Sequence, residues 1–287
     1  MRPFSSRVAD LPLLGLGVST EYGAFRVDNN LDVVGLRRTH PRYAGFLELG
    51  VEIEKGLDND ARAWVAAGLP TTYHFLDINL DDADDFDDDW VARTCALVSA
   101  ARPAWLCGDA GLWHFGPRDR GHMLLLPPIL TDDSATDLAT GCARLRELTG
   151  KEVLPENPPG TAFVGDLHLL DFFSRVAERA DTGLLLDVAH LAMFQHVTGR
   201  DALDGLDEFD CDRVVEIHVA GGTVRDVEGF SVIDDTHGTD VLDDTWRIFD
   251  HVVARAKNLK AVVFECERND NGDVLAGFAR LDRGWRR

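Results

Sequence analysis

Eight short apolar runs of strand length, separated by segments with helical periodicity, constrain the fold of this 287-residue chain most strongly. Several of the helical segments open on an Asp or Ser that can cap the first turn. The runs are residues 13–19, 46–52, 71–80, 104–113, 152–157, 183–191, 213–221 and 261–267, and the helical segments include 58–68, 87–102, 133–150, 167–180 and 244–258. Alternating strands and helices predict a parallel sheet, and eight strands predict a (β/α)8 TIM barrel.

An open, doubly wound parallel sheet is the rival architecture. Such a sheet ordinarily carries a glycine-rich phosphate turn after its first strand, and the segment GLGVSTEYG lacks the GxGxxG spacing. The chain contains no Pro/Gly/Ser-rich linker, internal repeat or low-complexity tail. We therefore expect residues 1–287 to form a single barrel domain.

The charge of the chain limits its partners. A formal net charge of -21 argues against nucleic acid and against an anionic membrane, because like charges repel. No apolar stretch approaches the roughly 20 residues of a membrane span, and the N-terminal run is too short for a signal peptide, so we expect a cytoplasmic protein. The acidic run 81–90 is typical of a solvated loop that leads into a helix.

The five cysteines are odd in number and lack paired spacing, so neither a disulfide framework nor a CxxC zinc site is predicted. No GxSxG elbow and no P-loop occurs, and no cysteine lies in a recognisably activated context. Chemistry based on a nucleophile or a nucleotide is therefore disfavoured.

Metal-binding residue types follow several of the predicted strands. In LLLDVAHL, Asp187 and His190 lie three residues apart where the strand passes into its loop, so both can face the barrel mouth. His218 lies within the apolar run VVEIHVAGG. Taken alone, an Asp and a His near a strand end are more often a helix cap and a surface residue, and a histidine in the position of His218 is as often a core residue as a ligand.

The segment IDDTHG places Asp235 and His237 on one side of an extended chain, where they could bind one ion, whereas Asp234 points the other way. The plainer interpretation is an Asp-rich turn. In the last strand, Glu265 and Glu267 alternate around Cys266, and we expect Glu265 to be the ligand because it lies deeper in the apolar run.

The N-terminal half offers further candidates. Glu156 and Asn157 end the fifth strand in PENPPG, where a carboxylate could bridge two cations, although the same segment reads as a plain turn signal. His74 lies in the third strand, where burying a histidine without a partner would be costly. The fourth strand offers Asp109 in CGDAG and, farther on, His114 in LWHFG.

Each of these residues is individually more often structural than catalytic. Together, four histidines, several carboxylates and an amide at strand ends exceed what one mononuclear site can use, which predicts two or three ions. Oxygen and imidazole donors without cysteine suit iron, manganese or zinc. Two histidines and a carboxylate leave open positions for O2 chemistry at iron, and zinc hydrolysis is also compatible with these residues.

The ordered motifs PENPP, LLLDVAHL, EIHVAGG, IDDTHG and VVFECE resemble the DUF692 family, the multinuclear non-haem iron-dependent oxidases that include the methanobactin synthase iron subunit. Weaker support comes from FLELGVE, YHFLDINL and LLPPILTDD, and the resemblance covers most of the chain. It implies a TIM barrel that holds two or three irons (Fe2+/Fe3+) and uses O2 as co-substrate. By motif, the implied metal ligands are His74, Glu156, Asp187, His190, His218, Asp235, His237 and Glu265.

The same resemblance implies a catalytic role for Asn157, in or next to the ligand set, and a precursor peptide or a small thiol-containing molecule as substrate. Members commonly oxidise cysteine or another side chain of ribosomally made peptides in natural-product biosynthesis, often with a small partner protein that binds the leader peptide. The chain departs from the family pattern in GVSTEYGAF, where many members carry a histidine, and in Gly108-Asp109-Ala110, where many carry Ser-Asp-His. Either Asp109 or His114 would then replace the missing ligand, or one metal position would be weakened or lost, and a dinuclear site is therefore favoured over a trinuclear one.

Two alternatives to an iron oxidase stay open. A divalent-metal isomerase or hydrolase of the xylose-isomerase-like barrel type would use Glu, His and Asp at strand ends without oxygen. A non-catalytic metal or peptide binder that serves another enzyme is the third, supported by the missing fourth-strand histidine.

Overall fold

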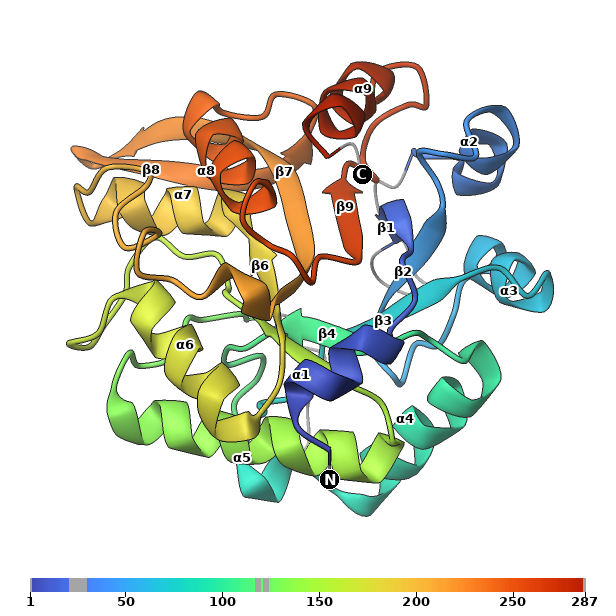
Figure 1. Cartoon of the computed structure of the whole chain (residues 1–287), viewed down its shortest axis with the longest axis horizontal. Coiled ribbons are helices and arrows are strands. Elements are labelled where there is room, and N and C mark those ends of the chain that lie inside the picture. The colour runs from blue at the N-terminus through green and yellow to red at the C-terminus, as the bar shows by residue number, and fades with distance from the viewer. Residues whose placement is uncertain (1, 21–29, 117–119, 121–123, 286–287) are drawn as a thin grey trace.

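The computed structural model describes residues 2–20, 30–116, 120 and 124–285. Pairing of β6 with β7 and of β9 with β1 closes a ring of eight parallel strands (Figure 1). The strands are β1 (Gly15–Thr20), β2 (Phe46–Val51), β3 (Thr71–Phe75), β4 (Leu106–Asp109), β5 (Val153–Glu156), β6 (Leu184–Asp187), β7 (Val214–Val227) and β9 (Ala261–Glu265). The predicted TIM barrel is confirmed.

Helices surround the barrel, and each predicted helical segment contains one. They are α2 (Val33–Thr39), α3 (Asn59–Ala66), α4 (Asp88–Ala101), α5 (Asp132–Thr149), α6 (Leu169–Ala180), α7 (Val188–Val197), α8 (Asp243–Val253) and α9 (Leu275–Gly284). Asp58 and Asp87 cap α3 and α4 by accepting hydrogen bonds from Ala61 and Trp90 N–H. Within the described ranges, no helix combines the length and the hydropathy needed to cross a membrane.

A short helix, α1 (Phe4–Arg7), closes the amino-terminal end of the barrel (Figure 1). Its Phe4 packs with the barrel residues Trp105 and Val215 in one apolar cluster. The buried guanidinium of Arg7 bonds Glu152, with Nε 2.5 Å from Oε1. This apolar floor leaves the opposite, carboxyl-terminal end of the barrel for polar residues.

Three predicted strands extend four or five residues beyond the carboxyl ends of the observed ones. The predicted strand 183–191 ends at Asp187, and α7 starts at the next residue. Apart from Asp187 and His190 its sequence is apolar, because β6 and the first two turns of α7 are both buried, so the pattern does not show where the strand ends. The predicted strands 71–80 and 104–113 likewise end at Phe75 and Asp109.

A hairpin that the apolar pattern did not predict projects from the barrel. Strand β7 continues to Val227 and pairs antiparallel with β8 (Phe230–Gly238) (Figure 1). The turn residues Glu228 and Gly229 both have positive φ, 53° and 87°, as two-residue hairpin turns require. Partly exposed strands have no continuous apolar run, which is why the sequence shows β8 only as polar motifs.

Candidate metal centre

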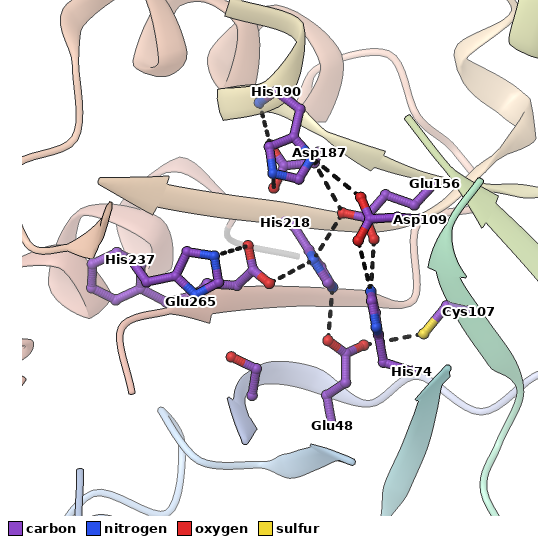
Figure 2. Close-up of polar contacts among 12 residues, drawn as sticks. Glu48, His74, Cys107, Asp109, Glu156, Asp187, His190, His218, His237 and Glu265 are labelled. Atoms are coloured by element: carbon purple, nitrogen blue, oxygen red, sulfur yellow. Dashed lines mark hydrogen bonds and ion pairs between the residues drawn. The ribbon is translucent and has the colours of Figure 1, made fainter. Parts of the chain in front are cut away.

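The predicted ligands converge at the carboxyl-terminal end of the barrel, where TIM-barrel active sites are built (Figure 2). Most lie at or near strand ends, His190 lies on α7, and the hairpin strand β8 adds two residues. They border a cavity of about 280 Å³ whose lining includes His74, Asp109, His190, Asp235, His237 and Glu265. Glu156, Asp187 and His218 are almost completely buried beside it.

Glu156 is central to one half of this cluster. Its Oε2 is 2.8 Å from Nε2 of His74, and its Oε1 is 3.2 Å from Nδ1 of His218. The same Oε1 is 3.8 Å from Nδ1 of His190. One carboxylate therefore faces imidazoles from β3, β7 and α7, as a bridging ligand would.

Asp235 and Glu265 link the other half. Oδ2 of Asp235 lies 3.3 Å from Nε2 of His190 and 3.0 Å from Nε2 of His237. Oε1 of Glu265 lies 3.2 Å from Nδ1 of His218. Asp235 and His237 thus face each other across a short distance, although the strand is not regularly extended here.

The backbone around His237 is irregular. Gly221 pairs with Gly238 and Gly222 with Asp235, so two residues of β8 bulge out of the ladder. His237 has a φ of 48°, in the left-handed region, which is costly for a residue with a side chain. A Cβ on Gly221 would lie 2.4 Å from the Gly238 carbonyl oxygen, so glycine is needed where the two strands meet.

Several buried polar atoms of the cluster make no hydrogen bond within the described part of the chain. They are Oδ1 of Asp109, Oδ2 of Asp187, Oδ1 of Asp235, Oε2 of Glu265 and both ring nitrogens of His218. Leaving one such group unpaired costs about 1–3 kcal/mol. Divalent cations would satisfy these atoms together, so the residues fit a metal centre.

The second ring nitrogens of two histidines support the same interpretation. Nδ1 of His190 is 2.9 Å from the backbone carbonyl oxygen of Asn157, and Nδ1 of His237 is 2.5 Å from Oε1 of Glu267. Metal-binding histidines typically donate one N–H to a carbonyl or carboxylate, which leaves the other nitrogen for the ion. In both residues the remaining Nε2 faces Asp235.

The candidate ligand atoms form overlapping groups rather than one group, with the atoms of each group within 4.8 Å of one another. Glu156 and Asp187 each belong to two of them. Four of the groups are His74/Asp109/Glu156, Glu156/Asp187/His190, Asp187/His218/Glu265 and Glu48/His74/His218. A fifth group, Glu48/Cys107/Glu216, includes a thiol and overlaps the others only through Glu48. Shared carboxylates can hold neighbouring ions a few ångströms apart, so this geometry suits more than one ion.

Burial and neighbouring charges shift the pKa values of the cluster. Burial alone would lower the pKa of His74, but nearby carboxylates, chiefly Glu156, raise it to about 9. Burial raises the pKa of Asp187 well above its usual range, against the opposing charge of His190. Burial also acts to raise the pKa of Glu156, but His218 and His74 hold it well below its usual range. An incoming cation must therefore displace protons from imidazole.

Of the two fourth-strand candidates, Asp109 lies in the cluster and His114 does not. Oδ2 of Asp109 is 3.9 Å from Nε2 of His74, and Oδ1 is 3.8 Å from Nδ1 of His190. His114 instead contacts Gly116 O at 2.7 Å and Oδ2 of Asp85 at 3.1 Å. His114 therefore belongs to a separate buried network.

That network also corrects the interpretation of the acidic run 81–90. Asp87 does cap α4, as a loop leading into a helix would. Asp85, however, is buried and pairs with Arg120 at 3.1 Å as well as with His114. One acid of the run is thus a core residue rather than part of a solvated loop.

Asn157 positions two candidate ligands. Its Oδ1 accepts a hydrogen bond from Asp187 N–H at 3.0 Å, and its Nδ2 donates to the Asp187 carbonyl at 2.8 Å. Its own backbone carbonyl accepts from His190 Nδ1. These contacts orient Asp187 and His190.

Two further acidic residues of the centre, Glu48 and Glu267, were not predicted as ligands or as positioning residues. Glu48 on β2 is buried, and its Oε1 is 3.0 Å from Nε2 of His218. Its Oε2 accepts hydrogen bonds from the side chains of Thr72 and Cys107, both at 3.2 Å. A charged residue inside the apolar run FLELGVE is the same signal that identified His218, and it could have revealed Glu48.

Two further expectations concern residues around the cavity. Ser19 and Thr20, at the end of β1, line it, whereas residues 21–25 of the divergent segment GVSTEYGAF lie outside the described residues. All five cysteines are free, and four of them are buried. Cys107 lies below the cluster, with its thiol against Glu48 (Figure 2).

Comparisons with known proteins agree with this geometry. A family model described as "RiPP precursor modification enzyme MbnB/TglH/ChrH" matches residues 35–275. A UPF0276 protein of Rhizorhabdus wittichii is 27% identical over 256 residues, which cover 85% of this chain and 89% of the relative. A UPF0276 protein of Rhizobium meliloti is 29% identical over 217 residues, 73% of this chain and 69% of the relative.

Solved structures with the same architecture are more distant in sequence. A xylose isomerase-like TIM barrel protein from Mycobacterium smegmatis in complex with magnesium superposes with a TM-score of 0.55 at 11% identity, covering 88% of this chain and 89% of that one. A structure of L-ribulose 3-epimerase gives a TM-score of 0.52 at 16% identity and covers 94% of each chain. Likeness at this level of identity concerns the fold alone.

Proposed function

This chain belongs to the family of RiPP precursor modification enzymes MbnB/TglH/ChrH, and from that premise we propose that it is a multinuclear iron enzyme. It uses O2 to oxidise a side chain, cysteine or another, of a ribosomally synthesised precursor peptide. The observation that carries the proposal is the sharing of Glu156 and Asp187 between neighbouring groups of candidate ligand atoms. A single ion would leave much of this buried donor set unsatisfied.

In this proposal the ions are held by His74, Glu156, Asp187, His190, His218, Asp235, His237 and Glu265, with Asp109 completing the fourth-strand side. Bound iron would supply one-electron chemistry and O2 activation. The apolar floor of the barrel keeps water from the cluster on one side, and the cavity admits substrate from the other. Asn157 and Glu267 hold His190 and His237 in the orientation that leaves one nitrogen of each toward the centre.

Metal analysis of protein purified without oxygen tests the proposal. We expect more than one iron per chain and iron-dependent O2 consumption with a precursor peptide. His190→Ala should lose iron because its Nε2 faces the cluster. His196→Ala, on the same helix, is the matched control: His196 is exposed and contacts Ser231 at 2.8 Å, so iron should be retained.

Three outcomes would overturn the proposal. Full activity with zinc alone would contradict the need for iron. Turnover without oxygen would favour a divalent-metal isomerase or hydrolase. Iron retained at the wild-type stoichiometry in His190→Ala would remove that residue from the centre and weaken the assignment of the site.

A further inference from the structure

An apolar groove of about 310 Å³ adjoins the cavity of the candidate metal centre. Leu125 and Pro159 line both, so they form a shared wall. The groove is built from four segments at the mouth of the barrel: residues 125–127 after β4, residues 159–162 after β5, Met193 of α7, and Ile233 with Asp234 of β8. The Asp234 carboxylate forms an ion pair with Arg225. Met193 and Ile233 are buried and form its floor, whereas Leu126 on the rim is 44% exposed.

The groove has a stiff frame. A Cβ on Gly160 would lie 2.6 Å from Cγ of Pro127, so the two proline-containing loops pack closely where glycine stands. Proline fixes its own φ and has no N–H to donate. The walls made by Pro127 and Pro159 therefore suit apolar groups better than polar ones.

Exposed apolar side chains concentrate on the same end of the molecule. Among the described residues, ten large hydrophobic side chains are exposed: Leu13, Val34, Phe115, Leu126, Ile129, Leu148, Val164, Val224, Val227 and Phe230. Seven of these ten lie between β4 and α5, between β5 and α6, or on the β7–β8 hairpin. Such clustering of apolar surface marks interaction sites, whereas scattered single residues do not.

We infer that this groove binds a large apolar side chain of the precursor peptide, next in the chain to the residue presented to the metal centre. The inference rests on the proposed function. The shared wall of Leu125 and Pro159 places the two sites next to each other, so one extended peptide that crosses this wall can reach both. The net charge of -21 disfavours an acidic segment, and we therefore expect neutral or basic residues around the apolar one.

The floor residue Met193 allows a direct test. The sequence has three methionines, Met1, Met123 and Met193, so methyl-labelled methionine gives a sparse NMR spectrum, and Met193→Leu assigns the groove signal. The protein is loaded with zinc, which is diamagnetic. The probes are two blocked hexapeptides with one cysteine flanked either by leucine and phenylalanine or by serines.

The leucine/phenylalanine peptide should shift the Met193 methyl signal in a saturable way, and the serine peptide should bind at least tenfold more weakly. Leu126→Asp should abolish the shift. Leu148→Asp is the matched control, since Leu148 is 41% exposed and ends α5 away from the groove, and it should behave as wild type.

Equal binding of both peptides, or unchanged binding by Leu126→Asp, would overturn the inference. A shift that grows with protein concentration in the absence of peptide would also overturn it, because a second copy of the chain would then fill the groove. The readout involves neither iron nor turnover. A selective methyl shift in a protein that consumes no O2 would contradict the proposed oxidase and support peptide binding in the groove. Iron-dependent turnover without the methyl shift would support the oxidase and contradict peptide binding in the groove.

Discussion

Replacing Glu267 with glutamine should weaken metal binding about tenfold while leaving the barrel folded. Glu267 is 1% exposed, and its Oε1 is 2.5 Å from Nδ1 of His237. A glutamine oxygen can accept the same hydrogen bond but carries no charge. A hydrogen bond to a charged group contributes about 1.5–3 kcal/mol and a neutral one about 0.5–1.5 kcal/mol. The difference of about 1–1.5 kcal/mol corresponds to roughly a tenfold change in affinity.

Competition with a chromophoric chelator under anaerobic conditions would measure this change. Glu216→Gln is the matched control, because it makes the same acid-to-amide change inside the same barrel. Burial raises the pKa of Glu216 to about 8, so this carboxyl is mostly protonated at neutral pH. Its Oε2 accepts from Trp105 Nε1 at 2.6 Å, which an amide oxygen can also do. Glu216→Gln should therefore bind metal as wild type does.

Thermal unfolding in excess chelator separates folding from metal binding in these variants. If Glu267→Gln binds metal as tightly as wild type, the Glu267–His237 contact does not prepare a metal ligand, and the reasoning from the second ring nitrogen fails. If Glu216→Gln loses as much metal affinity as Glu267→Gln, the loss comes from replacing any buried acid of the barrel by an amide and not from the Glu267–His237 contact. Either result would refute the argument.

Three other predictions follow from the geometry. Metal affinity should rise as pH increases from 7 toward 9, because His74, whose pKa is raised to about 9, holds a proton that the ion must displace. Calorimetry in buffers of different ionisation enthalpy should show that at least one proton is released for each chain that binds metal. Metal binding without proton release would contradict this prediction. Arg7→Ala should lower the free energy of unfolding by about 3–5 kcal/mol, because Glu152 then stays buried without its ion pair. Denaturant titration should show this loss of stability, and the metal content of the folded variant should equal that of wild type. Asp109→Asn should reduce the number of ions per chain, whereas His114→Gln should lower thermal stability and leave that number unchanged, as metal analysis of both variants would show.

The architecture could be predicted because each barrel strand is buried on both faces and therefore appears as an apolar run. Element ends could not be predicted from the same pattern. After Leu184 most residues of β6 and of the first turns of α7 are apolar, and only the structure shows Asp187 as the N-cap of that helix, accepting from His190 N–H at 2.6 Å. His190 therefore lies on a helix, where the sequence predicted the passage from a strand into a loop.

The candidate site was predictable to the extent that polar residues interrupt apolar runs. Asp187, His218 and Glu265 stand out in this way, and Glu48 would have done so under the same rule. The choice between Asp109 and His114 could not be made, because both follow the fourth run and side-chain direction beyond a strand end depends on local backbone angles. The bulge that orients His237 has no sequence signature of its own.

Strand β8 connects the metal centre with the groove. Ile233 forms part of the groove floor, and Asp235, two residues farther along the same strand, faces His190 and His237 at the centre. A peptide that fills the groove would thus be held by the same rigid elements that hold the candidate ligands, without a separate lid. Substitutions on the exposed rim, such as at Leu126, should then change which peptide is accepted while leaving metal binding intact, because Leu126 is not among the candidate ligands.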